Sequence, residues 1–214
     1  MAGKSTIKTA KPAEQQKKPY HHGALREALL EASERILERD GITGLTLRAA
    51  AREAGSSHAA PKNHFDDKTG LLSELAARGV SKLTDSMLTA AEGQPTALAR
   101  LNAIGRAYVE FAVANPGLFQ LMFRSERLDR ARPALFRETH RSLALLTDTV
   151  AAAHPVSQSS GDSSLASRAY VARAWTMVHG FAMLLIAGRL DPLIGEDKSG
   201  GDAMSLLEAM LALD

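Results

Sequence analysis

The side chains best suited to chemistry are polar groups clustered between residues 57 and 64, and they suit binding rather than catalysis. Ser57, His58, Lys62, Asn63 and His64 lie in one short segment. Their donors match phosphate oxygens and the edges of DNA bases. The cluster therefore points to a nucleic-acid contact, provided that the elements around it can present it.

Catalytic and metal-binding patterns are missing from the sequence. It has no Gly-x-Ser-x-Gly elbow, no His-Glu-x-x-His, no phosphate-binding loop and no dinucleotide fingerprint. It has no cysteine, which excludes thiolate nucleophiles, disulfides and cysteine-based zinc sites. His21 and His22 are adjacent and would diverge on a helix, whereas His58 and His64 are six residues apart. We predict no enzyme, no cofactor and no metal site.

Two short helices are predicted to position the polar cluster. Thr46 is suited to cap a helix over 47–54, and the turn 55–57 leads to a second helix over 58–65. Pro61 must lie in the first turn of this second helix, where its missing N–H costs least, and either serine of the turn could cap it. The first helix carries small residues that allow a close crossing: Ala50, Ala51 and Ala54. The spacing is typical of a helix-turn-helix, although an ordinary helical corner shares it.

The rest of the chain is also predicted to be helical, which gives an all-α fold of about nine helices. The sequence is 45% hydrophobic and only 5% aromatic, and it is rich in Ala and Leu, which favour helices. Apolar residues recur at spacings of three and four, and Gly and Pro mark the breaks. The predicted helices are 22–40, 47–54, 58–65, 68–89, 96–114, 118–124, 133–153, 165–190 and 203–213.

The N-terminal segment, 1–19, is predicted to be a disordered basic arm. Residues 1–20 hold five lysines and one glutamate. Such an arm either solubilises the chain or lies along DNA phosphates, and both interpretations stay open. The strongly apolar stretch 177–190 is too short and interrupted to span a bilayer, and no signal peptide is visible. We expect a cytoplasmic protein without a membrane partner.

The N-terminal part resembles the TetR family of transcriptional regulators. Three stretches match the family pattern in order and spacing: Tyr-His-His-Gly-Ala-Leu-Arg-Glu-Ala-Leu-Leu (20–30), Gly-Leu-Thr-Leu-Arg-Ala-Ala-Ala-Arg-Glu-Ala-Gly (44–55) and Ser-His-Ala-Ala-Pro-Lys-Asn-His-Phe-Asp-Asp-Lys-Thr-Gly-Leu-Leu (57–72). The C-terminal part is similar to a subgroup named for a Trp, His, Gly signature. Here that signature reads Trp175-Thr-Met-Val-His179-Gly180, followed by Gly188-Arg189-Leu190, and Asn-Pro-Gly-Leu-Phe-Gln-Leu-Met-Phe (115–123) also fits. The resemblance covers nearly everything beyond the basic arm.

The resemblance implies a DNA-binding domain over 20–70. At family positions, the start of the first short helix contacts phosphates, the start of the second contacts base edges, and Phe65 packs the three-helix core. The implied DNA-binding residues are Thr46, Arg48, Ser57, His58, Ala59, Lys62, Asn63, His64 and Lys68. Lys62 departs from the family's usual Tyr; it keeps a phosphate donor but loses the ring. Asn63 either reads an adenine or faces solvent.

The resemblance also implies a ligand-sensing and dimerising domain over 71–214. The dimer would form through the helices 165–190 and 203–213. Candidate pocket residues are adaptable or polar side chains, each of which could instead be ordinary core: Phe111, Phe119, Met122, Phe123, Phe136, His140, Trp175, Met177 and His179. Trp175 and His179 share one helix face because they are four residues apart. The six arginines within 124–141 form either a solvated face or an anion site.

Together these observations predict a homodimeric, sequence-specific DNA-binding regulator, most simply a repressor. It would bind a palindromic operator in double-stranded DNA and release it when a small-molecule effector binds. The alternative is a helical protein of the same fold that no longer reads DNA and serves as a ligand-binding or scaffold protein.

Overall fold

The computed structural model describes residues 22–155, 163–194 and 200–212. The predicted basic arm, 1–19, lies outside this range. The all-α prediction is confirmed, because the described residues form ten α-helices and one 3-10 helix and contain no strand. The first four helices are α1 (His22–Gly44), α2 (Leu47–Glu53), α3 (Ala60–Phe65) and α4 (Lys68–Ala91). The others are α5 (Ala97–Ala114), α6 (Pro116–Met122), η1 (Ser125–Arg127), α7 (Pro133–Ala153), α8 (Ser163–Ile186), α9 (Asp191–Ile194) and α10 (Gly200–Leu211).

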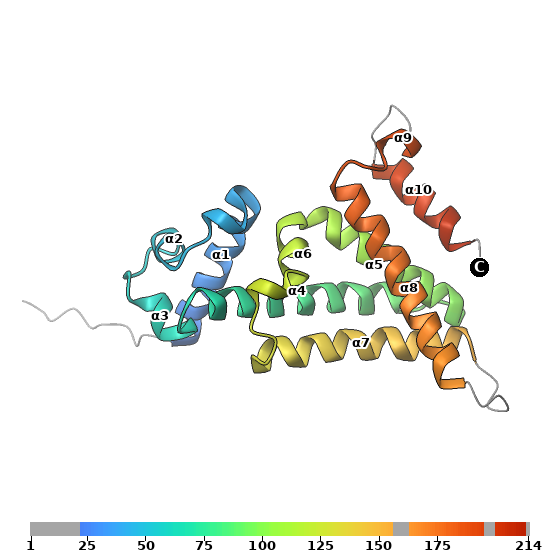
Figure 1. Ribbon diagram of the computed structural model, residues 1–214, viewed down its shortest axis with the longest axis horizontal. Coiled ribbons are helices and arrows are strands. Elements are labelled where there is room, and N and C mark those ends of the chain that lie inside the picture. Colours follow the sequence, from blue (N-terminus) through green and yellow to red (C-terminus); the bar gives the residue numbers. More distant parts are fainter. Residues whose placement is uncertain (1–21, 156–162, 195–199, 213–214) are drawn as a thin grey trace, which may run out of the picture.

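Helix α4 joins the two halves of the molecule. Its first turns pack with α1 and α3 at one end, and the rest packs against α5, α6 and α7 (Figure 1). Helix α8 crosses α5 and α7 at the other end, and α10 packs on α5. One continuous apolar core runs through both halves, from Leu29 and Phe65 through Leu75 to Phe119 and Phe181. The short helices α2 and α3 therefore stand on a rigid support.

Local sequence signals set most helix boundaries. Thr46 and Thr96 accept a hydrogen bond from the backbone N–H three residues on, at 3.0 and 3.1 Å, and thereby cap α2 and α5. Gly41 has φ 67°, which interrupts α1 where the sequence predicted its end. Gly188 has φ 65°, and the N–H of Arg189 bonds to the carbonyl of Leu184 at 2.8 Å, so α8 stops at Ile186 instead of 190.

Three other predicted details were wrong. Helix α3 begins at Ala60 rather than 58, and no side chain caps it; the hydroxyl of Ser56 donates instead to the carbonyl of Ala51. Helix α6 begins at Pro116, which the sequence suggested as a stop, because proline is tolerated in a first turn. The segment predicted as a loop over 191–202 contains the short helix α9 and the start of α10, which explains a count of ten helices.

Candidate nucleic-acid interface and ligand cavity

Helices α2 and α3 form a helix-turn-helix at the end of the molecule farthest from α8 (Figure 1). Gly55 adopts φ 63° directly after α2, and the N–H of Ser56 bonds back to the carbonyl of Ala51 at 2.9 Å, which closes the turn. The inner side of α3 is fixed by Pro61 and Phe65, which are buried. The side chain of Phe65 is fully buried, with the guanidinium of Arg26 5.7 Å from its ring centroid.

The opposite side of this corner is exposed and carries most of the predicted DNA-binding residues. Side chains of the turn and of α3 that face solvent are Ser57, His58, Ala59, Lys62 and Asn63. Arg48 on α2 is exposed as well, and Arg52, one turn farther along, is a cation that the sequence analysis missed. The spacing of four residues between Arg48 and Arg52 was the available signal, because it places both on one helix face.

The carboxylates near this surface are engaged elsewhere. Glu53 faces α1 and pairs with Arg35 at 3.2 Å and Arg39 at 3.5 Å, and the bond from Arg35 lowers the pKa of Glu53. Asp67 accepts from the N–H of Gly70 and caps α4. In contrast, Arg48, Arg52 and Lys62 form no ion pair with any described residue. The exposed side of α2 and α3 therefore presents cations to any anionic partner.

The other predicted contact residues are partly occupied. The hydroxyl of Thr46 caps α2, although the residue is exposed. Lys68 is half-buried, and its ammonium donates to the carbonyl of Ile42 at 3.3 Å, which ties the start of α4 to the end of α1. His64 is half-buried with its ring centroid 6.1 Å from that of Phe65. These three residues stand at the edge of the exposed surface rather than at its centre.

The turn from α3 to α4 leaves no space for a larger residue at Gly70. A Cβ atom on Gly70 would lie 1.9 Å from the carbonyl oxygen of Phe65. Asp66 adopts φ 66° in the same turn. The angle between α3 and α4 is therefore set by close backbone contact.

Two polar contacts fasten the helix-turn-helix to the rest of the chain. The carboxylate of Glu38 on α1 accepts from the backbone N–H groups of Gly117 and Leu118, at 3.1 and 2.9 Å, and so caps α6 from outside. The guanidinium of Arg132, just before α7, contacts Glu74 on α4 at 2.9 Å and Asp66 at 3.4 Å. The first contact joins α1 to α6, and the second joins the segment before α7 to α4 and to the end of α3.

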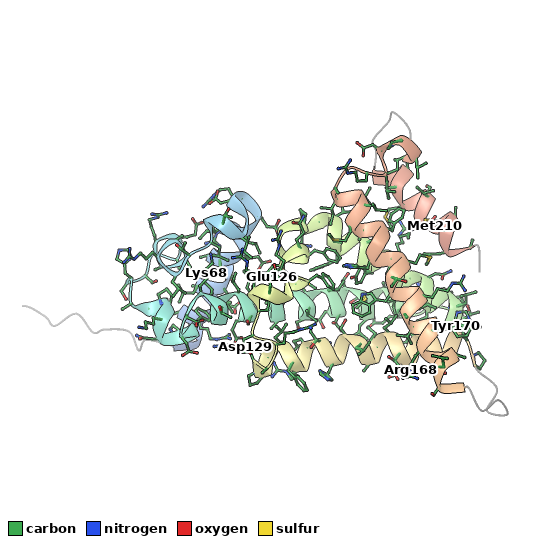
Figure 2. All side chains as sticks on the ribbon, viewed as in Figure 1. Lys68, Glu126, Asp129, Arg168, Tyr170 and Met210 are labelled. Carbon is green, nitrogen blue, oxygen red and sulfur yellow. The ribbon has the colours of Figure 1, made fainter. Side chains whose placement is uncertain are left out.

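A cavity of about 420 Å³ lies between α4, α5, α7 and α8 and extends to α6. Five of the nine candidate pocket residues line it: Met122, Phe123, His140, Trp175 and Met177. The remaining four do not line it. Phe111 and Phe119 are buried in the core, Phe136 is 53% exposed and lies against His140, and His179 packs behind the wall on Phe119 and Phe123. The sequence analysis missed Asn102, Tyr108 and Tyr170, which also line the cavity; Tyr170 lies at the opposite end of the molecule from Lys68 (Figure 2).

Tyr108 on α5 contacts both Trp175 and His179, which lie on one face of α8. The indole N–H of Trp175 donates to the Tyr108 oxygen at 3.4 Å, and that oxygen lies 2.9 Å from Nδ1 of His179. Because indole only donates, the Tyr108 oxygen accepts from Trp175. The direction of its bond with Nδ1 follows the tautomer of His179: the phenol donates when the ring proton is on Nε2 and accepts when it is on Nδ1. Burial lowers the pKa of His179 and raises that of Tyr108, so both groups are neutral at pH 7.

Comparison with known proteins identifies relatives of both halves. Residues 101–212 match the family described as "Tetracyclin repressor-like, C-terminal domain". A protein of unknown function from Rhodococcus sp. RHA1 is 37% identical with a TM-score of 0.73, over 92% of this chain and 96% of that one. A TetR family transcription regulator from Marinobacter aquaeolei VT8 is 17% identical over 86% of this chain and 94% of that one, and its TM-score of 0.58 indicates a shared fold.

A curated relative adds a sequence match. The HTH-type transcriptional regulator YobS of Bacillus subtilis (strain 168) is 29% identical over 98 residues. The match covers 46% of this chain and spans about half, 51%, of the length of that relative.

Proposed function

This chain belongs to the family of tetracycline repressor-like proteins, and from that premise we propose that it is a DNA-binding transcriptional regulator. The observation that carries the proposal is the exposed side of α2 and α3. It gathers Arg48, Arg52, Lys62 and the polar side chains of the turn, while the nearby carboxylates are engaged elsewhere. In a helix-turn-helix the second helix enters the major groove with its N-terminal residues at the base edges. Residues 57–59 stand at that N-terminus in this chain.

The residues divide into two roles in this proposal. Arg48, Arg52 and Lys62 bind backbone phosphates and set the register on DNA. Ser57, His58 and Asn63 meet base edges, and Asn63 has the donor and acceptor needed to pair with an adenine. Thr46, Ala59, His64 and Lys68 complete the contact surface, because family members use these positions. Lys62 replaces the ring of the family's usual tyrosine with a longer, charged side chain.

We further propose that two copies assemble through α8 and α10. By length and composition alone, α8 could cross a membrane, but its exposed residues include Arg168, which suits a protein partner better than lipid. Leu165 and Leu184 on this helix are 55% and 46% exposed. A Cβ on Gly180 would meet nothing within 4 Å. Glycine within a helix lowers helix stability by about 1 kcal/mol relative to alanine. The close approach of a second α8 gives a reason for a glycine at this position.

In the dimer, the α3 helices would lie in successive major grooves about 34–36 Å apart and bind a palindromic operator, so that transcription is blocked. A small molecule in the cavity between α4 and α8 would favour a different distance between the two α3 helices of the dimer and so weaken operator binding. The size of the effect depends on the difference in ligand affinity between the DNA-binding state and the state with the other spacing. Arg132 and Glu38 are suited to couple the cavity to α3. Arg132, just before α7, contacts Asp66 at the end of α3, and Glu38 joins α6 to α1, which packs against α2. We place this regulator in the cytoplasm.

Salt dependence of DNA binding tests this function. Fluorescence anisotropy with labelled duplex DNA would be recorded over a salt series for the wild type, Lys62→Ala and Arg100→Ala. Arg100 is a matched control, because it is exposed on α5, far from α3, and has no ion pair with a described residue. Each lost phosphate contact lowers the slope of log K against log salt by about 0.9, so Lys62→Ala in a dimer should lower it by about 1.8. Absent DNA binding by a folded wild-type dimer would favour the alternative, a ligand-binding or scaffold protein.

A further inference from the structure

The cavity between α4, α5, α7 and α8 has a one-sided charge. Among the described residues that line it, there is no aspartate and no glutamate, whereas Arg130 and Arg173 both line it. His140 and His154 are the other titratable nitrogen-bearing side chains of the wall. A cationic ligand would find no anionic partner in such a wall. An anionic ligand would find a guanidinium, the group that best matches a carboxylate in shape and charge.

The cavity is also elongated. Its wall includes Arg130, which precedes α7, and His154, which follows it. Helix α7 has 21 residues, which at about 1.5 Å per residue gives a length of about 31 Å. Between these ends most of the wall is apolar, with side chains such as Leu83, Leu143 and Val178. The volume of about 420 Å³ lies in the range of about 300–1,000 Å³ that is typical of small-molecule sites.

Three polar side chains of the wall have no partner among the residues that the structure describes. Arg130 is exposed and forms no hydrogen bond or ion pair with any described residue. The half-buried side chains of Asn102 and Ser142 likewise have no hydrogen-bond partner among those residues. Half-buried polar groups are normally satisfied. A ligand carboxylate would give Arg130 a partner, and the largely apolar middle of the cavity would take the hydrocarbon part of the ligand.

The deep part of the cavity offers no charged partner to a ligand. Burial raises the pKa of Tyr108 in the wall and lowers that of His179 behind it, so both groups are neutral at pH 7. The charged group of a ligand must therefore stay near an arginine at one end of the cavity. Arg130 is the better suited of the two arginines for this contact, because its guanidinium would not have to break an ion pair or hydrogen bond with a described residue.

We propose that this cavity binds an elongated lipophilic anion, which has an apolar body and one carboxylate. Arg130 anchors the carboxylate, and lipophilic cations do not bind. The proposal names the class of small molecule that the cavity binds. Only the effect of this ligand on DNA binding rests on the proposed function. Ligand binding itself is a property of the free protein and can be measured without DNA.

The test uses three probes with the same ten-carbon chain and different head groups: decanoate, decanol and decyltrimethylammonium. The two ionic probes are kept below the concentrations at which they form micelles, and decanol below its solubility limit. Isothermal titration calorimetry on the full chain should show decanoate binding at least tenfold more tightly than either other probe. Arg130→Gln should weaken decanoate binding about tenfold. Arg127→Gln is the matched control; Arg127 is exposed in η1, close in sequence, and does not line the cavity.

Two results would overturn the proposal: binding of the alcohol or the cation as tightly as decanoate, or equal affinities of Arg130→Gln and Arg127→Gln for decanoate. Thermal unfolding without ligand would verify that both variants are folded. Anisotropy with DNA separates this inference from the proposed function. Decanoate binding to a protein that does not bind DNA, or that binds DNA equally with and without decanoate, would support the ligand class and contradict regulation through the cavity.

Discussion

The hydrogen-bonded chain Trp175–Tyr108–His179 gives a quantitative prediction for Tyr108→Phe. The substitution keeps the ring, which packs edge-on against Phe119 with centroids 5.4 Å apart, and removes only the hydroxyl. The bond at 2.9 Å to half-buried His179 is lost, which costs about 1 kcal/mol. The contact of 3.4 Å with Trp175 adds little, since Trp175 is 42% exposed and water can replace it.

We therefore expect Tyr108→Phe to lower the free energy of unfolding by about 1 kcal/mol and the Tm by about 2–4 °C. Urea unfolding followed by circular dichroism measures the first quantity. Tyr170→Phe is the matched control, because the Tyr170 ring stacks on His154 at 4.6 Å while its hydroxyl has no partner among the described residues. Equal stabilities of the two variants would refute the reasoning, since both lose one hydroxyl and only one of these is hydrogen-bonded.

The same chain predicts how stability depends on pH. Burial lowers the pKa of His179 in the folded state below its usual value of about 6.5. Between the two values the unfolded chain binds more protons, so this contribution to stability is complete above about pH 6.5 and is lost as the pH falls toward the folded pKa. For one proton the slope is at most about 1.4 kcal/mol per pH unit. Urea unfolding at pH 7.5 and 5.5 should show a smaller loss for His179→Gln than for the wild type; equal losses would contradict the assignment.

Three further substitutions test the contacts that hold the N-terminal helices on the rest of the chain. Gly70→Ala should destabilise the fold by about 1–3 kcal/mol and reduce DNA binding, because the new Cβ meets the carbonyl of Phe65; unchanged urea unfolding would contradict this. Arg132→Gln should lower the free energy of unfolding by about 1–2 kcal/mol. The side chain of Arg137 is 68% exposed, so Arg137→Gln should change the same quantity by less than about 0.5 kcal/mol. Identical urea unfolding curves for the two variants would contradict this prediction. Glu38→Gln should cost about 0.5–1 kcal/mol through the weaker cap of α6, and no change would show that the cap contributes nothing.

Local sequence signals predicted the helix-turn-helix well. Thr46, Gly55 and Pro61 each act within a few residues, through a cap, a left-handed turn and a first-turn proline. The predicted burial of Phe65 is also confirmed, since its side chain is fully buried. The capping of α3 was predicted wrongly, because two adjacent serines offered equivalent caps and the hydroxyl of Ser56 bonds backward instead.

The sequence did not predict contacts between residues that lie far apart along the chain. The helical spacing placed Trp175 and His179 on one face, but nothing in it identified Tyr108, which lies about 70 residues earlier, as their shared partner. The links from Arg132 and Glu38 likewise depend on how whole helices pack. Residue type alone did not separate Phe123, which lines the cavity, from Phe136, which points to solvent.

The central claim is that α3 reads DNA as part of a two-fold dimer. The most direct measurement is selection of bound sequences from random duplex DNA at moderate salt, with the wild type and the double variant His58→Ala, Lys62→Ala. We predict that the wild type alone enriches one palindrome whose half-sites lie about one helical turn, 10–10.5 base pairs, apart or a multiple of it. Enrichment of the same palindrome by both proteins would contradict the role of α3, and enrichment by neither, with a folded dimer, would contradict DNA reading by this chain.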